Sequence, residues 1–446
     1  MRVLVLLFFI HISYLSFSND NIKVLMGGTL IDGYGSHTIK NSVIIIQDDI
    51  IKEVGSIGNI KIPQEAEIIS TEGMSVLPGL WDMHVHLDIN GHTDYSHWHD
   101  VYPIIFEDVI MPSSAHQLLL AGVTSARDCG APLNDIISIR EKINKNIIPG
   151  PNLYVSGPFL QHKPYPNTEL YRWGINGVED AKRKVKKLVN AGVDFIKLID
   201  QDQMTMEELY AVVKESHKNG LKVVAHGHRP EEIRRGLKVG VDCFEHTGLS
   251  SAPGYPEDVM SMIRERTAQM NLGPLFWTPT VSPLYNYEYI RDNMEILDND
   301  SWHLGLPDSI IQDIRNSFKH PDRLPYYQLT PSRKPTLKRK INQLIDAGVV
   351  LMIGTDSGVP LTFHSQSTWN ELEIWVNEFG IDPMYAIRAA TYWPSLWMGV
   401  SEKVGTITPG KKADIIAVKG DVLRNISILQ RIDIVLKDGK IIEKPN

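Results

Sequence analysis

Residues of the types that bind metal ions recur in this sequence where short apolar runs end. GLWDMHVHLD holds two histidines two positions apart, and later runs end in single histidines or an aspartate. Residues i and i+2 of a β-strand point to the same face, so a strand here aims both rings into one space. Neutral imidazoles and carboxylates suit Zn²⁺ or a similar ion. We therefore predict a metal centre that involves His84, His86, Lys197, His226, His246 and Asp356.

The number of these residues predicts two metal ions rather than one. Four histidines and an aspartate exceed what one tetrahedral ion needs when a position stays open for substrate. Two ions about 3.5–4 Å apart need an anion between them. Lys197 lies inside the apolar run DFIKLI, where an unpaired ammonium is costly. Its neutral amine can react with CO₂ to give a carbamate anion with two oxygens, so N6-carboxylysine at Lys197 is the expected bridge.

A repeated unit between residues 78 and 404 would position these side chains. AGVDFIKLI and NGLKVVAH each place an apolar run after a glycine, and amphipathic segments precede most such runs. In one segment, Thr205 and Glu208 form a capping box and Gly220 marks the helix end. Helix, glycine and buried strand form the unit of a parallel sheet. About eight candidate strands predict an α/β fold, a (β/α)8 TIM barrel with its chemistry at the C-terminal strand ends.

The two ends of the chain have a different pattern. Residues 19–77 and 405–446 hold short β-branched runs broken by turn residues. Neither end is long enough to bury a sheet face alone, so we expect both to form one composite β-sandwich domain beside the barrel. Two long segments, 90–112 and 285–334, follow the first and seventh barrel strands. They would overhang the active face, and the sequence leaves their roles open.

The first residues and the composition bear on location and partners. Residues 1–18 combine a basic start, an apolar run and a small-x-small exit, which is the pattern of a signal peptide. We expect export to the periplasm or secretion, without stable membrane insertion after the signal is removed, because no later apolar stretch is long enough to span a bilayer. The net charge of −8 argues against a nucleic-acid partner. Cys129 and Cys243 are too few for a disulfide scaffold, and whether they are free is left open.

Together these motifs resemble the metal-dependent amidohydrolase superfamily. LPGLWDMHVHL is similar to its first metal-binding strand and AGVDFIKL to its carboxylated-lysine strand. VVAHGH, VDCFEHTG and GTDSGVP look like its strands five, six and eight. The likeness is greatest to the imidazolonepropionase-like and Xaa-Pro/Xaa-Arg dipeptidase branch, which includes ochratoxin-hydrolysing relatives. It extends over nearly the whole mature chain.

The resemblance implies a division of roles among the predicted site residues. Carboxylated Lys197 and a hydroxide would bridge two divalent ions, with zinc expected. The remaining ligands would form two groups, His84, His86 and Asp356 for one ion and His226 and His246 for the other.

Two further histidines are candidates for substrate contact. His226 is assigned as the ligand over His228 because it matches the first histidine of the strand-five motif. His228 would then contact substrate or orient a ligand. His162 stands where many relatives carry a Gly-His-rich loop, but here it is followed by lysine and proline.

The implied reaction is hydrolysis of an amide or peptide bond, not primarily of an ester, with Asp356 and Lys197 as catalytic residues. Metal binding can lower the pKa of water to about 7, so hydroxide exists at neutral pH. Asp356 would take the proton during attack and pass it to the leaving amine. The expected substrate is a small molecule, a dipeptide or an N-acyl amino acid, with side chains that the sequence does not specify. A homo-oligomer is compatible with this sequence.

Three alternatives remain at this point. A one-metal deaminase would need a catalytic glutamate soon after the strand-five histidine, but Glu231 and Glu232 are expected on the next helix. A one-metal imidazolonepropionase, which opens a cyclic amide, fits an exported protein badly. An inactive exported binding protein should have lost a ligand, whereas every predicted ligand position is filled.

Overall fold

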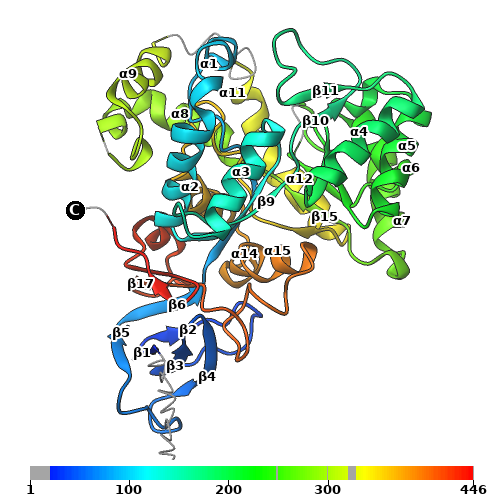
Figure 1. Ribbon diagram of the computed structural model, residues 1–446. Coiled ribbons are helices and arrows are strands. Elements are labelled where there is room, and N and C mark those ends of the chain that lie inside the picture. The colour runs from blue at the N-terminus through cyan, green and yellow to red at the C-terminus, as the bar shows by residue number, and fades with distance from the viewer. Residues whose placement is uncertain (1–20, 248–249, 299, 320–327, 445–446) are drawn as a thin grey trace, which may run out of the picture.

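The structure is a computed structural model that describes residues 21–247, 250–298, 300–319 and 328–444. The expected signal peptide, residues 1–18, lies outside these ranges. Helices surround parallel strands in an α/β body with a TIM-barrel-like fold, and further β-sheets lie at one end of the molecule (Figure 1).

Two parallel sheets make up the strand layer of the α/β body. One has three strands in the order β7-β8-β9 and the other has seven in the order β11-β10-β12-β13-β14-β15-β16. The bounds of the first sheet are β7 (Leu80–Val85), β8 (Val123–Asp128) and β9 (Asn152–Val155). Those of the second are β10 (Phe159–Gln161), β11 (Arg172–Gly174), β12 (Phe195–Leu198), β13 (Lys222–His226), β14 (Cys243–Glu245), β15 (Phe276–Thr278) and β16 (Val350–Leu351).

Backbone hydrogen bonds join the edges of these two sheets. The Asp194 amide donates to the Val155 carbonyl at 2.8 Å, which links the segment before β12 to β9. At the other edge, the Met83 amide donates to the Ile353 carbonyl at 2.9 Å and the Asp356 amide to the His84 carbonyl at 2.7 Å. The first strand therefore lies beside the segment that carries Asp356. Full closure into a (β/α)8 barrel stays a prediction.

Helices with one apolar face pack around these strands. In α5 (Met206–Lys218), the Thr205 hydroxyl accepts from the Glu208 amide and the Glu208 carboxylate accepts from the Thr205 amide, which confirms the predicted capping box. The other helices are α1 (Tyr95–Val101), α2 (Met111–Leu120), α3 (Leu133–Asn144), α4 (Val178–Ala191), α6 (Pro230–Val239), α7 (Glu257–Thr267), α8 (Ser282–Asp292), α9 (Asp308–Ser317), α11 (Thr330–Arg333), α12 (Leu337–Asp346), α13 (Ser367–Glu373), α14 (Pro383–Ala389) and α15 (Tyr392–Trp397).

Strands from both ends of the chain pair with each other. In the sheet β19-β18-β17-β6-β2, β6 runs antiparallel to β17, with Leu77 opposite Ile416. A second sheet has the order β4-β3-β1-β5, and one apolar cluster contains residues of both sheets. The bounds are β1 (Ile22–Met26), β2 (Thr29–Leu30), β3 (Ser42–Gln47), β4 (Ile50–Ser56), β5 (Glu67–Ser70), β6 (Met74–Pro78), β17 (Ile415–Lys419), β18 (Ile434–Lys437) and β19 (Lys440–Ile441).

Two of the expected strands are interrupted in the structure. The run from Ser75 to Leu87 divides at Gly79 into β6 and β7, which belong to different sheets. A side chain at Gly79 would lie 2.1 Å from the Thr124 hydroxyl, so this crossing of the chain needs glycine. The run NLYVSGPF, residues 152–159, which its pattern predicts as one strand, likewise divides into β9 and the start of β10. Cys129 and Cys243 are both buried and free. Within the described ranges, no helix has the length and apolar character needed to cross a membrane.

Candidate metal centre and active site

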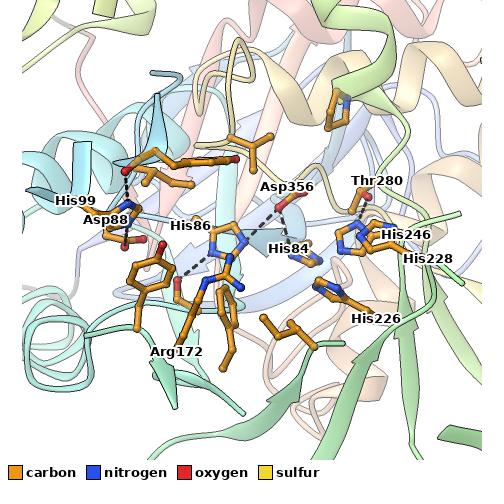
Figure 2. A pocket seen from close by; sticks show the side chains of 18 of the residues that line it. His84, His86, Asp88, His99, Arg172, His226, His228, His246, Thr280 and Asp356 are labelled. Atoms are coloured by element: carbon orange, nitrogen blue, oxygen red, sulfur yellow. Dashed lines mark hydrogen bonds and ion pairs between the residues drawn. The ribbon is translucent and has the colours of Figure 1, made fainter. Parts of the chain in front are cut away.

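A pocket of about 250 Å³ opens where the parallel strands end, and it collects most of the predicted site residues. Figure 2 shows His226, His228 and His246 toward one end of this pocket and Asp88, His99 and Arg172 toward the other. The residues that line this pocket include His84, His86, Asp88, His99, Phe159, Tyr171, Arg172, His226, His228, His246, Thr280 and Asp356.

His84, His86 and Asp356 form what we call the first donor set. His84 is in β7, and His86 follows that strand directly. The Asp356 carboxylate lies 3.4 Å from His84 Nε2 and 3.2 Å from His86 Nε2. One ligand atom from each of the three residues lies within 4.8 Å of the others, a spacing that allows all three to hold one ion. The structure therefore brings together the three residues that the sequence assigned to one metal.

Neighbouring groups fix the orientation of both imidazoles in this set. His84 Nδ1 donates to the Glu245 carboxylate at 2.7 Å, and His86 Nδ1 donates to the Gly130 carbonyl at 2.9 Å. Because these bonds use Nδ1 of each ring, Nε2 is the nitrogen of each ring that faces Asp356 and is available to a metal ion. A hydrogen bond of this kind to the rear nitrogen is the usual support of a metal-binding histidine.

Glu245 also receives a buried arginine. Arg127 Nη2 donates to Glu245 Oε1 at 2.5 Å, and both side chains are fully buried. Sequence reasoning overlooked Glu245 and Arg127. A signal was present, because Glu245 lies in VDCFEHTG and Arg127 in VTSARDC, two runs that predict buried strands, where a charged side chain is costly.

His226, His228 and His246 form the second donor set. One ligand atom from each lies within 4.8 Å of the others. The rings of His228 and His246 stack with centroids 4.1 Å apart, and His246 Nδ1 bonds the Thr280 hydroxyl at 2.7 Å. Within the described residues, the Nδ1 atoms of His226 and His228 have no hydrogen-bond partner. The His228 ring lies at least as close to the His246 ring as the His226 ring does. The choice of His226 as the ligand therefore stays a prediction.

Lys197 lies in β12 and is fully buried. Its Nζ has no hydrogen-bond partner among the described residues. A buried polar group without a partner costs free energy, so a group that binds this nitrogen is expected. The two donor sets together offer five imidazoles and a carboxylate, which are ligands that suit a metal ion. These donors and the unpartnered Lys197 amine both fit a metal centre.

Burial keeps most of these imidazoles neutral, which is the form that binds a metal ion. It lowers the pKa of His228 to about 3. It also lowers the pKa well below the usual value for His84, His226 and His246. His86 differs, because its hydrogen bond to Asp356 and the charge of that carboxylate outweigh burial and raise its pKa to about 9. Burial alone would raise the pKa of Asp356, but its electrostatic interactions with His84 and His86 and its hydrogen bond with His86 hold that pKa below its usual value.

Three residues that line the pocket have a strained backbone. Asp356, His246 and Thr280 have φ values of 59°, 70° and 47°, in the left-handed region that side chains other than glycine rarely adopt. Such conformations cost free energy and tend to cluster at functional sites. At Gly130, a side chain would lie 1.7 Å from the Phe159 ring, so the carbonyl that supports His86 requires glycine at this position.

The structure places His162 outside the pocket lining. Its side chain is 48% exposed, and its nearest carboxylate is Glu208 at 3.8 Å. Glu231 and Glu232 lie on α6, as expected. The Glu232 carboxylate accepts the Arg229 amide at the start of this helix, and that of Glu231 accepts from Arg235. Neither therefore stands free to serve as the glutamate of a deaminase.

Three pocket residues that sequence reasoning missed lie at the end opposite the second donor set. Asp88 and His99 are separated by 3.6 Å, and the His99 ring stacks on Tyr171 with centroids 4.2 Å apart. Arg172 enters from β11. Asp88 directly follows the HVHL motif, and this position was the one available signal. His99, in α1, lies within the segment 90–112 that was expected to overhang the active face, but neither His99 nor Arg172 in β11 could be singled out, because tertiary packing brings both to the pocket.

The comparison with known families agrees with this geometry. The profile of the Amidohydrolase family matches residues 75–442. The chain belongs to the amidohydrolase family. An imidazolonepropionase of Flavobacterium johnsoniae is 23% identical to it over 385 residues, which cover 86% of each chain.

Solved structures of this amidohydrolase's relatives share its fold. A Xaa-Pro dipeptidase with methionine bound in its active site is 24% identical, with a TM-score of 0.71 over 95% of this chain and 100% of the other. The A. niger ochratoxinase is 23% identical, with a TM-score of 0.71 over 96% of each chain. The resemblance seen in the sequence is confirmed, and the protein is a hydrolase that acts on C–N bonds of amides.

Proposed function

We propose that this amidohydrolase holds two divalent metal ions and cleaves the amide bond of a dipeptide or an N-acyl amino acid. One observation carries the proposal. Two donor sets line one pocket, and the buried amine of Lys197 has no partner in the described part of the chain. Lys197 lies close enough to interact electrostatically with His84 and Asp356 of the first set and with His226 of the second, as a bridging residue must.

Each set would hold one ion, with zinc expected from the imidazole and carboxylate donors. Lys197, as its N6-carboxylate, would complete both. When bound, such ions supply Lewis acidity, which activates water and polarises a carbonyl. His84 and His86 are oriented for this task by Glu245 and Gly130.

Asp356 is the proton carrier in this proposal. Its side chain is 20% exposed and faces the pocket, so it can touch both water and substrate. Its low pKa keeps it ionised and able to accept a proton from attacking water. It then delivers that proton to the nitrogen of the leaving amine, which departs neutral as the C–N bond breaks.

A one-ion enzyme that opens a cyclic amide is the second candidate. The similarity to an imidazolonepropionase over 86% of the chain favours it. The two candidates differ in metal content and in the need for Lys197, because a single ion requires no bridge.

Metal stoichiometry combined with a substrate screen tests the proposal. The metal-loaded protein should contain two ions per chain and hydrolyse members of a panel of Xaa-Pro dipeptides, Xaa-Arg dipeptides and N-acyl amino acids. Lys197→Ala should reduce the metal content and abolish hydrolysis, whereas Lys214→Ala, at an exposed position on α5, should change neither. A short carboxylic acid should partly restore the Lys197→Ala enzyme. Two ions and normal turnover in Lys197→Ala would refute the bridge.

Two further proposals concern the whole chain. We propose that the paired strands of 19–77 and 405–446 form one β-sandwich domain beside a closed eight-stranded barrel, which the β6–β17 pairing and the sheet-edge hydrogen bonds support. We also propose that residues 1–18 direct export to the periplasm or outside the cell. N-terminal sequencing of the native protein should find these residues removed, and a chain that begins at Met1 in the cytosol would contradict export.

A further inference from the structure

Arg172 is a charged pocket residue for which the proposed reaction has no use so far. It begins β11 and lines the pocket together with both donor sets. No carboxylate among the described residues pairs with it, and its Nη1 donates to the neutral amide oxygen of Gln161 at 3.2 Å. Its Nε is buried and has no partner in the described part of the chain. Arg172 is partly exposed as a residue, but a guanidinium with an unpaired buried N–H is costly unless an acceptor completes it.

Aromatic rings hold the guanidinium in place. Its central carbon lies 5.3 Å from the centre of the Phe159 ring, 4.8 Å from that of Tyr165 and 5.3 Å from that of Tyr171. Cation–π contacts of this kind stabilise the charge without using its N–H donors. The rings therefore hold the planar group in place, and its unpaired Nε suits a carboxylate, which a guanidinium can bind through two parallel hydrogen bonds.

Phe159 links this cation to the candidate metal centre. The same ring that contacts Arg172 also meets the edge of the His86 imidazole, with centroids 5.7 Å apart. A substrate whose carbonyl lies at the first donor set would thus place a group a few bonds away near Arg172. In Figure 2, Arg172 lies on the His86 side of the pocket, away from the second donor set.

We propose that Arg172 binds the free carboxylate of the substrate, so that this enzyme selects amides that carry a carboxylate near the scissile bond and rejects their neutral counterparts. The kinetic test of this inference rests on the proposed amide hydrolysis. The binding test does not, because it needs no turnover. The alternative is that Arg172 only supports the three aromatic rings, in which case substrate charge would not matter.

The test compares each active dipeptide with its C-terminal amide. In the wild-type enzyme, kcat/KM should be at least tenfold higher for the acid than for the amide. Arg172→Gln should lower kcat/KM for the acid by about 10- to 100-fold, mainly through KM, because a hydrogen-bonded charge is lost. It should change the value for the amide less than threefold. Arg172→Lys should fall between the two enzymes, because it keeps the charge and loses the two-pronged geometry.

Controls separate this inference from a folding defect and from the proposed function. Arg183→Gln, at a side chain that is 73% exposed on α4, should leave both substrates unaffected. Equal losses for acid and amide in Arg172→Gln, or equal wild-type rates for both, would overturn the inference while amide hydrolysis stands. If no compound in the panel is hydrolysed, calorimetry with N-acetyl amino acids and their amides decides. If the wild-type protein binds the N-acetyl amino acids and Arg172→Gln abolishes this binding, the inference is supported even though the proposed hydrolysis is not. If the wild-type protein does not bind them, the inference is refuted.

Discussion

At the scale of single residues, two carboxylates of the site, Asp356 and Glu245, each interact with two nitrogen-bearing side chains. Asp356 faces two imidazoles, which keep its carboxylate ionised in a buried site. The Glu245 carboxylate accepts hydrogen bonds from both His84 and Arg127. Changes at these two carboxylates should therefore have different consequences, one for catalysis and one for stability.

Asp356→Asn should keep much of the metal content and lose activity. The amide retains an oxygen that can bind an ion, but it cannot carry a proton between water and the leaving amine. General acid–base groups contribute about 10²–10⁴-fold to the rate, so kcat should fall by this factor. Metal analysis and steady-state kinetics on the same preparation measure both. Near-normal turnover by a metal-loaded Asn variant would exclude the proton-carrier role.

Glu245→Gln should destabilise the protein, because Arg127 would remain buried without a counter-charge. Removing one partner of a buried ion pair costs about 3–5 kcal/mol. Urea unfolding of the two proteins gives the difference. The double change Arg127→Met with Glu245→Gln should recover part of the loss, since it removes the uncompensated charge as well. A single variant as stable as the parent would mean that the pair contributes little.

At the scale of elements, the site residues that could be predicted from the sequence are those in regular strands or at their ends. His84, His86, Lys197 and Asp356 could be assigned because they stand in or at the ends of apolar runs, and parallel strands bring such ends together. The break between β6 and β7 was not predictable, because the run across Gly79 is continuously apolar and the cause is a close approach of Thr124.

Loops explain the remaining differences. Arg172 begins the three-residue strand β11 and His162 lies in the loop before it, a stretch with little regular structure, yet Arg172 lines the pocket and His162 is half exposed. Sequence periodicity has no bearing on such a stretch, because contacts with distant residues decide where each side chain points. Arg172 is held by the rings of Phe159, Tyr165 and Tyr171, and the role of these rings could not be read before the fold was known.

One contact between α5 and the segment before β14 should depend on pH. His217 lies 2.8 Å from Asp242, whose hydrogen bond raises the pKa of His217 above its value in the unfolded chain. The pair therefore contributes its full stability below about pH 6.5, and the contribution is lost as the pH rises through the folded pKa. His217→Gln should cost less than about 1 kcal/mol near pH 6, because the pair is partly exposed, and nothing near pH 9.

Urea unfolding at both pH values checks this expectation. His37→Gln, at an exposed position, serves as the matched control and should show no such difference. A loss for His217→Gln that is the same at both pH values would show that packing, not charge, explains the contact.

At the scale of the whole molecule, the two chain ends depend on each other. Val76 lies opposite Ala417, and both are fully buried. An unpaired β6 would expose a sheet edge and part of an apolar cluster that both ends share. The stability of the α/β body is thus tied to sheets formed outside it.

Deleting the chain from Gly405 onward should therefore unfold or precipitate the protein. The deletion removes β17, β18 and β19, and with them the partner of β6. Expression in soluble form and thermal unfolding of the truncated chain measure the effect. Removal of the two final residues, 445–446, is the control and should be harmless. A truncated protein that stays soluble and equally heat-stable would show that the N-terminal strands need no partner.

The pairing of β6 with β17 also determines when folding can end. The Ser75 hydroxyl bonds the Gly420 carbonyl, a residue 345 positions further along the chain. During translation, β6 leaves the ribosome early and waits for its neighbour until nearly the last codons are read. Contacts this distant in sequence slow folding, and an unpaired strand edge can join the wrong chain meanwhile. The β6 edge therefore stays open until β17 has been synthesised, and a chain whose synthesis stops before β17 cannot close it.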